Sequence, residues 1–181
     1  MQGFGEHSAA WETEELFAEN RESLMRYLRR RLDDLTAAED LLQESFIRFF
    51  QARQRGETID QPRAWLFRVA HNLVIDYGRR KHPDLLDDES WLKLEGRFEG
   101  SERVLEARAL LARLPWERLT RLELECLRLR SEGLRFREVA EALDLSISTV
   151  ASYIARAVRK LQEAGTRERD SSKQGRTAAP R

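Results

Sequence analysis

The apolar residues between Phe136 and Leu161 constrain the fold more than any other feature of the chain, because their spacing fits only helices. In two adjacent stretches they recur every three or four residues, the period of one helix face. The first stretch contains Phe136, Val139, Ala140 and Leu143, and the second contains Ile147, Val150, Ile154, Val158 and Leu161. Asp144-Leu145-Ser146 separates them and has the composition of a tight turn. We therefore predict two short helices, crossing closely at the small Ala140.

The opposite face of the second helix carries small hydroxyl groups near its N-terminus and cations toward its end. These residues are Ser148, Thr149, Ser152, Arg156, Arg159 and Lys160. Small side chains at a helix N-terminus can approach base edges in the major groove, while Arg and Lys meet phosphates. The pattern predicts a helix-turn-helix that docks on double-stranded DNA. The alternative is a plain helical hairpin with a solvated polar face.

The rest of the chain repeats the helical period and shows no strand-like alternation. We predict an all-α fold of two small helical domains joined by an acidic linker. The expected divisions are a polar extension over 1–13, a helical domain over 14–82, a linker over 83–100, the helix-turn-helix domain over 101–164 and a basic, disordered tail over 165–181. The linker assignment follows from its 6 acidic and 2 basic residues.

Local signals predict the bounds of the individual helices. The first is expected over 14–35, and the second after Thr36, which would form a capping box with Glu39. The third should begin at Pro62, after Gly56 has ended the second. In the C-terminal domain we expect helices over 101–114 and 116–132, the latter closed by Gly133.

Each predicted helix has an apolar face that should be buried. The expected sets are Phe17, Leu24, Leu28, Leu32 and Leu35; Ala38, Leu41, Leu42, Ser45, Phe46, Phe49 and Phe50; Leu66, Val69, Leu73 and Tyr77; and Leu119, Leu122, Cys126 and Leu129. Trp65 is also expected in the core, whereas Phe67, His71 and Asn72 are assigned to the outer side of the third helix. There an aromatic and basic surface would suit unstacked bases.

Composition narrows the class of protein further. The chain has 32 basic and 32 acidic residues, so no overall positive field indicates a nucleic-acid partner. A single cysteine, Cys126, excludes an internal disulfide and is expected to be a buried apolar residue. No apolar run approaches the roughly 20 residues of a membrane span, and the N-terminus lacks the order of a signal peptide. We expect a cytoplasmic protein without membrane insertion.

Four stretches of the sequence resemble the extracytoplasmic-function (ECF) sigma factors, the compact two-domain members of the bacterial sigma family. In chain order they are AEDLLQESFIRFF, PRAWLFRVAHNLVIDYGRRK, LLARLPWERLTRLELECLRL and FREVAEALDLSISTVASYIARAVRKL. The resemblance extends over about residues 16–161. It implies an alternative sigma factor, which binds core RNA polymerase, directs it to specific promoters and helps to melt the minus-ten element.

The resemblance also implies a role for particular residues. Polymerase binding would fall to Asp40, Gln43, Glu44 and Phe46, and the minus-ten DNA to Asn72, Asp76, Arg79 and Arg80. The minus-thirty-five element would be read by Ser148, Thr149, Ser152 and Arg156, with Arg159 and Lys160 on phosphates. Binding energy alone would perform this function, so we expect no catalytic residue, cofactor, metal or small-molecule substrate. Promoter DNA would be bound both as a duplex and where locally melted.

One departure from the family pattern lies in the second helix of the motif. Where many members carry basic residues, this chain has Ala151 and Tyr153, which makes the helix less cationic. In this respect the chain is similar to members tied to iron uptake. Many relatives are inhibited by an anti-sigma factor, and we keep such a partner as a hypothesis.

Two other classes of function stay open at this point. One is a two-domain transcription regulator whose N-terminal unit senses a ligand or a phosphoryl group. The other is a helical metal-dependent hydrolase built on His71 and Asp76. The second is disfavoured because those residues are five apart, and neither has a candidate metal-ligand partner at four-residue spacing.

Overall fold

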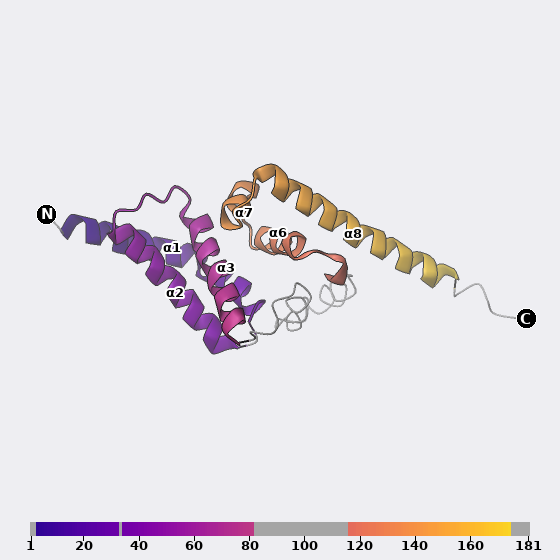
Figure 1. The fold of residues 1–181 in the computed structure, drawn as a ribbon, viewed down its shortest axis with the longest axis horizontal. Coiled ribbons are helices and arrows are strands. Elements are labelled where there is room, and N and C mark those ends of the chain that lie inside the picture. The colour runs from indigo at the N-terminus through magenta and orange to yellow at the C-terminus, as the bar shows by residue number, and fades with distance from the viewer. Residues whose placement is uncertain (1–2, 33, 82–115, 175–181) are drawn as a thin grey trace, which may run out of the picture.

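Helices form all the secondary structure in the residues that the computed structural model describes, which are 3–32, 34–81 and 116–174 (Figure 1). The all-α prediction is confirmed for these residues. The elements are α1 (Gly3–Arg29), α2 (Leu35–Gln54), α3 (Pro62–Lys81), the 3-10 turn η1 (Trp116–Arg118), α6 (Arg121–Ser131), α7 (Phe136–Ala142) and α8 (Ile147–Gln174).

The three N-terminal helices pack around one apolar core, with α1, α2 and α3 each in contact with the other two. Tyr27 of α1 is fully buried, and its ring meets the edge of Phe67 from α3 at a centroid distance of 5.7 Å. Phe49 of α2 packs in the same way on Trp65, also at 5.7 Å. Aromatic pairs in this edge-to-face geometry add to the stability that burial alone provides.

The first helix begins and ends earlier than the sequence predicted. It starts at Gly3 rather than near Glu14, and it ends at Arg29 rather than at Leu35. The early start has a physical reason: Glu12 forms an ion pair with Arg53 of α2, with Nε and Oε2 2.6 Å apart, and Ala9 is buried. Leu35 belongs to α2 and is half exposed, so its predicted place in the core is wrong.

The cap of α2 also differs from the prediction. Asp34, in an extended conformation, accepts hydrogen bonds from the backbone N–H groups of Thr36 at 2.9 Å and Ala37 at 3.3 Å. An aspartate at this position satisfies donors that the helix itself leaves unpaired. The expected capping box of Thr36 and Glu39 is therefore wrong. The predicted end at Gly56 is confirmed, because this residue has a φ of +79°.

The predicted helix over 116–132 is divided into two elements. After η1, Thr120 begins α6 with a capping box: its N–H donates to Glu123 Oε2 at 2.8 Å, and its Oγ1 accepts from the Glu123 N–H at 3.4 Å. Leu122 points outward, contrary to prediction, and Leu124 is buried in its place. Gly133, with a φ of +88°, follows the end of α6 as expected.

Helices α7 and α8 meet at the predicted turn, where Asp144 has a φ of +54°. Val139 and Ala140 are buried, as expected, but Phe136 is exposed and lies beneath the guanidinium of Arg130, 5.1 Å from its ring centre. Along α8 the predicted buried face is wrong at two positions. Ile147 and Val158 are about half exposed, and the fully buried residues are Val150 and Ala157. The small side chain of Ala157 permits close approach of α8 to the domain core.

The basic end of the chain is more ordered than its composition indicated. Helix α8 continues to Gln174, so the prediction of disorder from residue 165 is wrong over 165–174. The acidic linker over 83–100 and the helix expected over 101–114 lie outside the described residues. Where the domains begin and end stays a prediction.

The two groups of helices pack directly on each other. Helix α7 contacts α3 (Figure 1). Leu129, Leu134 and Val139 join the apolar cluster that contains Leu66 and Phe67. None of the described helices combines the length and apolar character that a membrane span requires.

Candidate nucleic-acid interface

A network of hydroxyl groups builds the N-terminus of α8. Ser146 Oγ accepts from the backbone N–H of Thr149 at 3.0 Å, and it lies 2.9 Å from Ser148 Oγ and 2.7 Å from Thr149 Oγ1. Ser146 is therefore the cap of this helix, a role that a serine three residues before Thr149 could have indicated. The same contacts hold Ser148 and Thr149, two of the predicted base-reading residues, at the exposed start of the helix.

The remaining predicted DNA-reading residues of α8 follow along its outer side. Ser152 is exposed, and the side chains of Arg156 and Arg159 are 48% and 67% exposed. The Arg156 guanidinium lies over the ring of Tyr153, 4.7 Å from its centre, which restrains its direction. This face can thus present hydroxyls and two cations to a duplex.

Arg156 Nε lies 3.9 Å from the Glu123 carboxylate of α6, and Lys160 makes a closer contact with the same group. Its Nζ lies 2.6 Å from Glu123 Oε2 on α6 and 3.1 Å from the carbonyl oxygen of Arg118. Burial alone would raise the pKa of Glu123, but the hydrogen bonds from Lys160 and Thr120 hold that pKa below its usual value. Lys160 neutralises a carboxylate whose side chain is only 3% exposed, so it could hold a phosphate only by leaving that carboxylate.

The residues predicted to meet minus-ten DNA share one side of the second half of α3. Asn72, Asp76, Arg79 and Arg80 are all exposed, at a spacing of four, three and one residues. The Arg80 Nε donates to the carbonyl oxygen of Asp76 at 3.2 Å. The structure therefore brings these four together and leaves them open to solvent.

The aromatic part of that predicted surface is absent from the exposed side. Phe67 was assigned outward but is fully buried against Tyr27. Trp65 packs on the core, as expected. His71 was also assigned outward but turns toward α1 and α6. In this conformation the outer side of α3 therefore offers polar and charged groups, rather than these rings, to a nucleic acid.

The predicted polymerase contacts lie on α2. Asp40 and Gln43 are exposed, and Glu44 pairs with Arg48 across one turn, with Oε1 and Nε 2.7 Å apart. Phe46 does not share this surface. It is 5% exposed, and its ring packs on Phe17 at a centroid distance of 4.9 Å, so its position supports the core rather than a contact.

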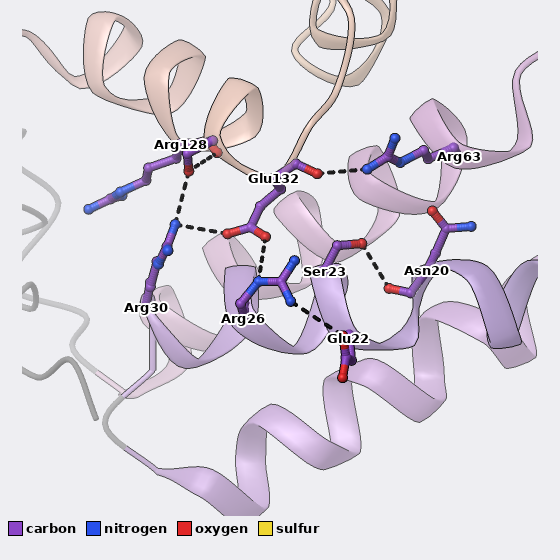
Figure 2. A network of polar contacts seen from close by, with 9 residues as sticks. Asn20, Glu22, Ser23, Arg26, Arg30, Arg63, Arg128 and Glu132 are labelled. Carbon is purple, nitrogen blue, oxygen red and sulfur yellow. Dashed lines mark hydrogen bonds and ion pairs between the residues drawn. The ribbon is translucent and has the colours of Figure 1, made fainter. Parts of the chain in front are cut away.

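The sequence reasoning missed a polar cluster where α6 meets α1 and α3, centred on Glu132 (Figure 2). The side chain of Glu132 is 1% exposed and pairs with two arginines, one in the last turn of α1 and one just after it: Arg26 Nε at 3.1 Å and Arg30 Nη1 at 2.8 Å. Arg63 of α3 donates from Nη2 to the backbone carbonyl oxygen of Glu132 at 2.7 Å. The pairs join residues about a hundred positions apart, so no local pattern indicated them.

A second cluster lies nearby around Glu125 of α6. This buried carboxylate pairs with Arg31, just beyond the end of α1, and, at 2.8 Å, with Arg128. His71 Nδ1 lies 2.9 Å from the hydroxyl oxygen of Tyr27 and 3.6 Å from Glu125 Oε2. Burial and the neighbouring guanidiniums of Arg31, Arg121 and Arg128 lower the pKa of His71 to about 3. The imidazole is therefore neutral despite its nearness to Glu125, because burial and three cations outweigh one carboxylate.

In the described segments, no three His, Cys, Asp or Glu side chains converge in a way that could hold a metal ion. Cys126 is fully buried, and burial raises the pKa of its thiol to about 11.

Two family models match separate parts of the chain. Residues 16–83 match the model of Sigma-70 region 2, and residues 117–168 match that of bacterial regulatory proteins of the luxR family. The chain is 42% identical over 65 residues to the ECF RNA polymerase sigma factor SigL of Mycobacterium tuberculosis, which is 35% of this chain and 37% of SigL. The match thus spans little more than a third of that relative.

Other relatives are similar over longer stretches. The ferric citrate uptake sigma factor FecI of Escherichia coli is 28% identical over 153 residues, 80% of this chain and 86% of FecI. The transcriptional activator protein RaiR of Rhizobium etli is 35% identical over 103 residues, 57% of this chain and 41% of RaiR. Among solved structures, CnrH in complex with the cytosolic domain of CnrY matches with a TM-score of 0.57 and 25% identity, over 88% of this chain and 95% of that one. The chain therefore combines a match to sigma-70 region 2 with a match to the helix-turn-helix domain of luxR-family regulators, and it is similar to the ECF RNA polymerase sigma factor SigL over 65 residues and to the sigma factor FecI over most of its length.

Proposed function

We propose that this chain is an alternative sigma factor that binds core RNA polymerase, selects promoters and helps to open the minus-ten element. The observation that carries the proposal is the pairing of a sigma-70 region 2 domain with a helix-turn-helix whose outer face is exposed. Similarity to FecI over most of both chains supports the same function. The chain would contribute binding energy to transcription and leave the chemistry of RNA synthesis to the polymerase.

In this proposal Asp40, Gln43 and Glu44 contact the polymerase. They are accessible on α2, and acidic groups there would complement a basic surface on the partner. We leave Phe46 out of the contact, because its ring is buried against Phe17.

The DNA contacts in the proposal fall on two helices. Asn72, Asp76, Arg79 and Arg80 lie on the exposed side of α3, where they would meet the minus-ten element. On α8, Ser148, Thr149, Ser152 and Arg156 would read the minus-thirty-five element, and Arg159 would hold a phosphate. Lys160 joins the phosphate contacts only if it leaves Glu123.

The test is transcription with purified components. Core RNA polymerase and the chain are mixed, passed over a gel-filtration column, and then supplied with fragmented genomic DNA from the source organism. We expect co-elution, and transcripts that start at sites the core alone ignores. Sequencing the 5′ ends of these transcripts would identify the promoters. Failure to co-elute with any bacterial core polymerase, including that of the source organism, would refute the proposal.

A charge-reversal pair sharpens this test. Asp40→Lys with Glu44→Lys should abolish co-elution and leave the fold intact, because both side chains point away from the core. Glu15→Lys with Glu19→Lys is the matched control, since these α1 residues are also exposed and acidic. Equal polymerase binding by the two variants would show that the contact lies elsewhere.

The subgroup and the protein partner of this sigma factor are finer proposals. Similarity to FecI and the uncharged Ala151 and Tyr153 support an iron-uptake type. Promoters recovered in the transcription test should then lie upstream of genes induced by iron limitation; their absence there would reject this type. CnrH is described in complex with the cytosolic domain of CnrY, which supports a protein partner for this chain as well, and we propose that this partner is an anti-sigma factor. Crosslinking in non-inducing cells should recover such a protein, and recovery of polymerase alone would count against it.

The second candidate is a two-domain transcription regulator with an N-terminal sensor unit. The luxR-type match and the similarity to RaiR favour it. Such a protein would bind its DNA sites with the same affinity whether or not polymerase is present, whereas a sigma factor would need the polymerase. Measuring DNA affinity in both conditions separates the two functions.

A further inference from the structure

The two exposed arginines of α8 differ in how firmly the domain holds them. The Arg156 guanidinium lies over the ring of Tyr153, 4.7 Å from its centre, and its Nε lies 3.9 Å from Glu123 Oε1 on α6. Within the part of the chain that the structure describes, Arg159 has one polar contact, a pair across one turn whose Nε and Glu163 Oε1 are 4.0 Å apart. Arg156 is therefore restrained from two sides, and Arg159 from one.

The ring that holds Arg156 is itself fixed in the domain. Tyr153 is half buried and packs on the apolar cluster that contains Val139 and Val150. Because side chains of a helix lean toward its N-terminus, a residue three positions later can cover this ring. The stacked guanidinium therefore lies over the turn that also carries Ser152, an exposed residue of the proposed reading surface. Tyr153 thus orients a long side chain that would otherwise occupy many rotamers.

The Glu123 carboxylate restrains Arg156 without cancelling its charge. Lys160 Nζ lies 2.6 Å from Glu123 Oε2 and neutralises the carboxylate, whereas Arg156 Nε meets Oε1 at 3.9 Å, beyond hydrogen-bond distance. Since Nε faces Glu123, a contact through two donors falls to the terminal Nη1 and Nη2 groups. Two such parallel donors match the O6 and N7 acceptors that guanine presents in the major groove.

A guanine and a phosphate make different demands on an arginine. The two acceptors of guanine require the guanidinium in one plane and one direction, whereas a phosphate oxygen accepts a cation from many directions. A side chain that is already oriented loses less rotamer freedom when it forms the guanine contact. The restrained Arg156 is therefore suited to a base edge, and the less restrained Arg159 to a phosphate.

We propose that Tyr153 is a positioning residue, which orients Arg156 toward a guanine of the bound duplex and so determines the base preference of α8. This inference rests on the proposed function, which places α8 on the minus-thirty-five element, and it adds the base that is read and the residue that directs the reading. Tyr153 itself need not touch DNA. Its ring acts through the guanidinium that it supports.

The test uses the complex of the full chain with core polymerase. The minus-thirty-five element of a promoter recovered in the transcription test is randomised, and the duplexes that the complex binds are sequenced. We expect guanine to be enriched at one position by the parent and not by Arg156→Ala. That guanine is then replaced by deazaguanine, in which carbon takes the place of N7, and the affinities for the two duplexes are compared. Their ratio measures how well Arg156 reads the base.

Three variants separate positioning from a structural role. Tyr153→Leu, which removes the ring, should lower the affinity ratio by roughly two- to fivefold, the size of an exposed cation–π contact. Tyr153→Phe keeps the ring and should retain the ratio of the parent. Phe136→Leu is the matched control, because it removes the ring beneath Arg130 in the same domain, and it should leave the ratio unchanged. A merely structural residue would weaken binding to both duplexes equally and would not move their ratio.

The outcomes distinguish this inference from the proposed function. An unchanged ratio in folded Tyr153→Leu would overturn the positioning role, even if the chain proves to be a sigma factor. Tyr153→Met, which fills the same space without a ring, decides the test if circular dichroism shows that Tyr153→Leu is not folded. Guanine enrichment that survives Arg156→Ala at every position would overturn the inference as well. If the chain never binds core polymerase, the proposed function fails and the inference fails with it.

Discussion

The neutral state of His71 predicts that acid destabilises this protein. The imidazole lies between α1 and α6, where it faces Tyr27 of α1 and Arg31 just after that helix, and Glu125, Arg128 and Arg121 from α6. Burial and the guanidiniums lower its pKa to about 3, from about 6.5 in the unfolded chain. The unfolded state therefore binds more protons than the folded state at every pH between these values. Stability from this residue is full above pH 6.5 and is lost as the pH falls toward 3.

The size of the effect follows from the two pKa values. Each unit of pKa difference corresponds to about 1.4 kcal/mol, and pH 5 lies about one and a half units below the pKa of His71 in the unfolded chain. The free energy of unfolding should therefore fall by about 2 kcal/mol between pH 7.5 and pH 5 because of His71 alone. For a small domain this is a large part of the total stability.

Urea unfolding at the two pH values measures the loss, in the parent and in His71→Gln. Glutamine keeps a polar group near Tyr27 but does not titrate. The other two histidines of the chain remain in both proteins, so the difference between the two losses isolates His71. We expect the parent to lose about 2 kcal/mol more than the variant. Equal losses would show that His71 is accessible to protons in the folded state, and the reasoning would be refuted.

Three further predictions concern the caps and the DNA-reading helix. Asp34→Ala should lower the free energy of unfolding by about 1 kcal/mol and Thr36→Ala by clearly less, because Asp34 provides the cap of α2. Thermal unfolding measures both losses, and a larger loss in Thr36→Ala would contradict this assignment of the cap. Lys160→Ala should destabilise the C-terminal domain by roughly 1 to 3 kcal/mol, and Glu123→Gln in the same chain should recover part of the loss; no recovery in urea unfolding would contradict the pairing. Arg156→Ala should weaken binding to specific promoters by roughly 1 to 3 kcal/mol and leave binding to random DNA nearly unchanged; equal losses on both in a titration would assign Arg156 to phosphates.

The elements that the sequence predicted well are those whose cause is local. The starts of α3 at Pro62 and of α8 after the turn at Asp144 follow from backbone preferences of a few neighbouring residues. The cap of α2 was misassigned because Asp34 and Thr36 are both good caps, and the sequence alone does not show at which of them the helix begins. The inward turn of Phe67 was missed for a related reason. Helix α3 packs against three other elements, α1, α2 and α7, so it buries a wider stripe than one simple period describes.

In the candidate site too, the residues that depend on local spacing could be predicted, and those that depend on distant contacts could not. The exposed face of α8 could be predicted, because amphipathic spacing determines which side chains point outward. Lys160 was expected on DNA, since the sequence alone cannot show that a buried carboxylate lies opposite it. The interdomain contacts of Glu132 were beyond any pattern, because they join residues that are distant in the chain.

Helix α6 explains why charge, as well as apolar packing, determines how this molecule is assembled. Three of its flanking or internal carboxylates are buried, and each faces a cation from another element: Glu123 meets Lys160 of α8, while Glu125 and Glu132 meet arginines at or beyond the end of α1. From the sequence alone, these glutamates would be expected on the exposed face of an ordinary helix. Once buried, each makes its cationic partner necessary, since an unpaired carboxylate there would cost several kcal/mol. The contact within the C-terminal domain and the contact between the domains therefore share one design, in which a buried carboxylate is held by a cation from a neighbouring element.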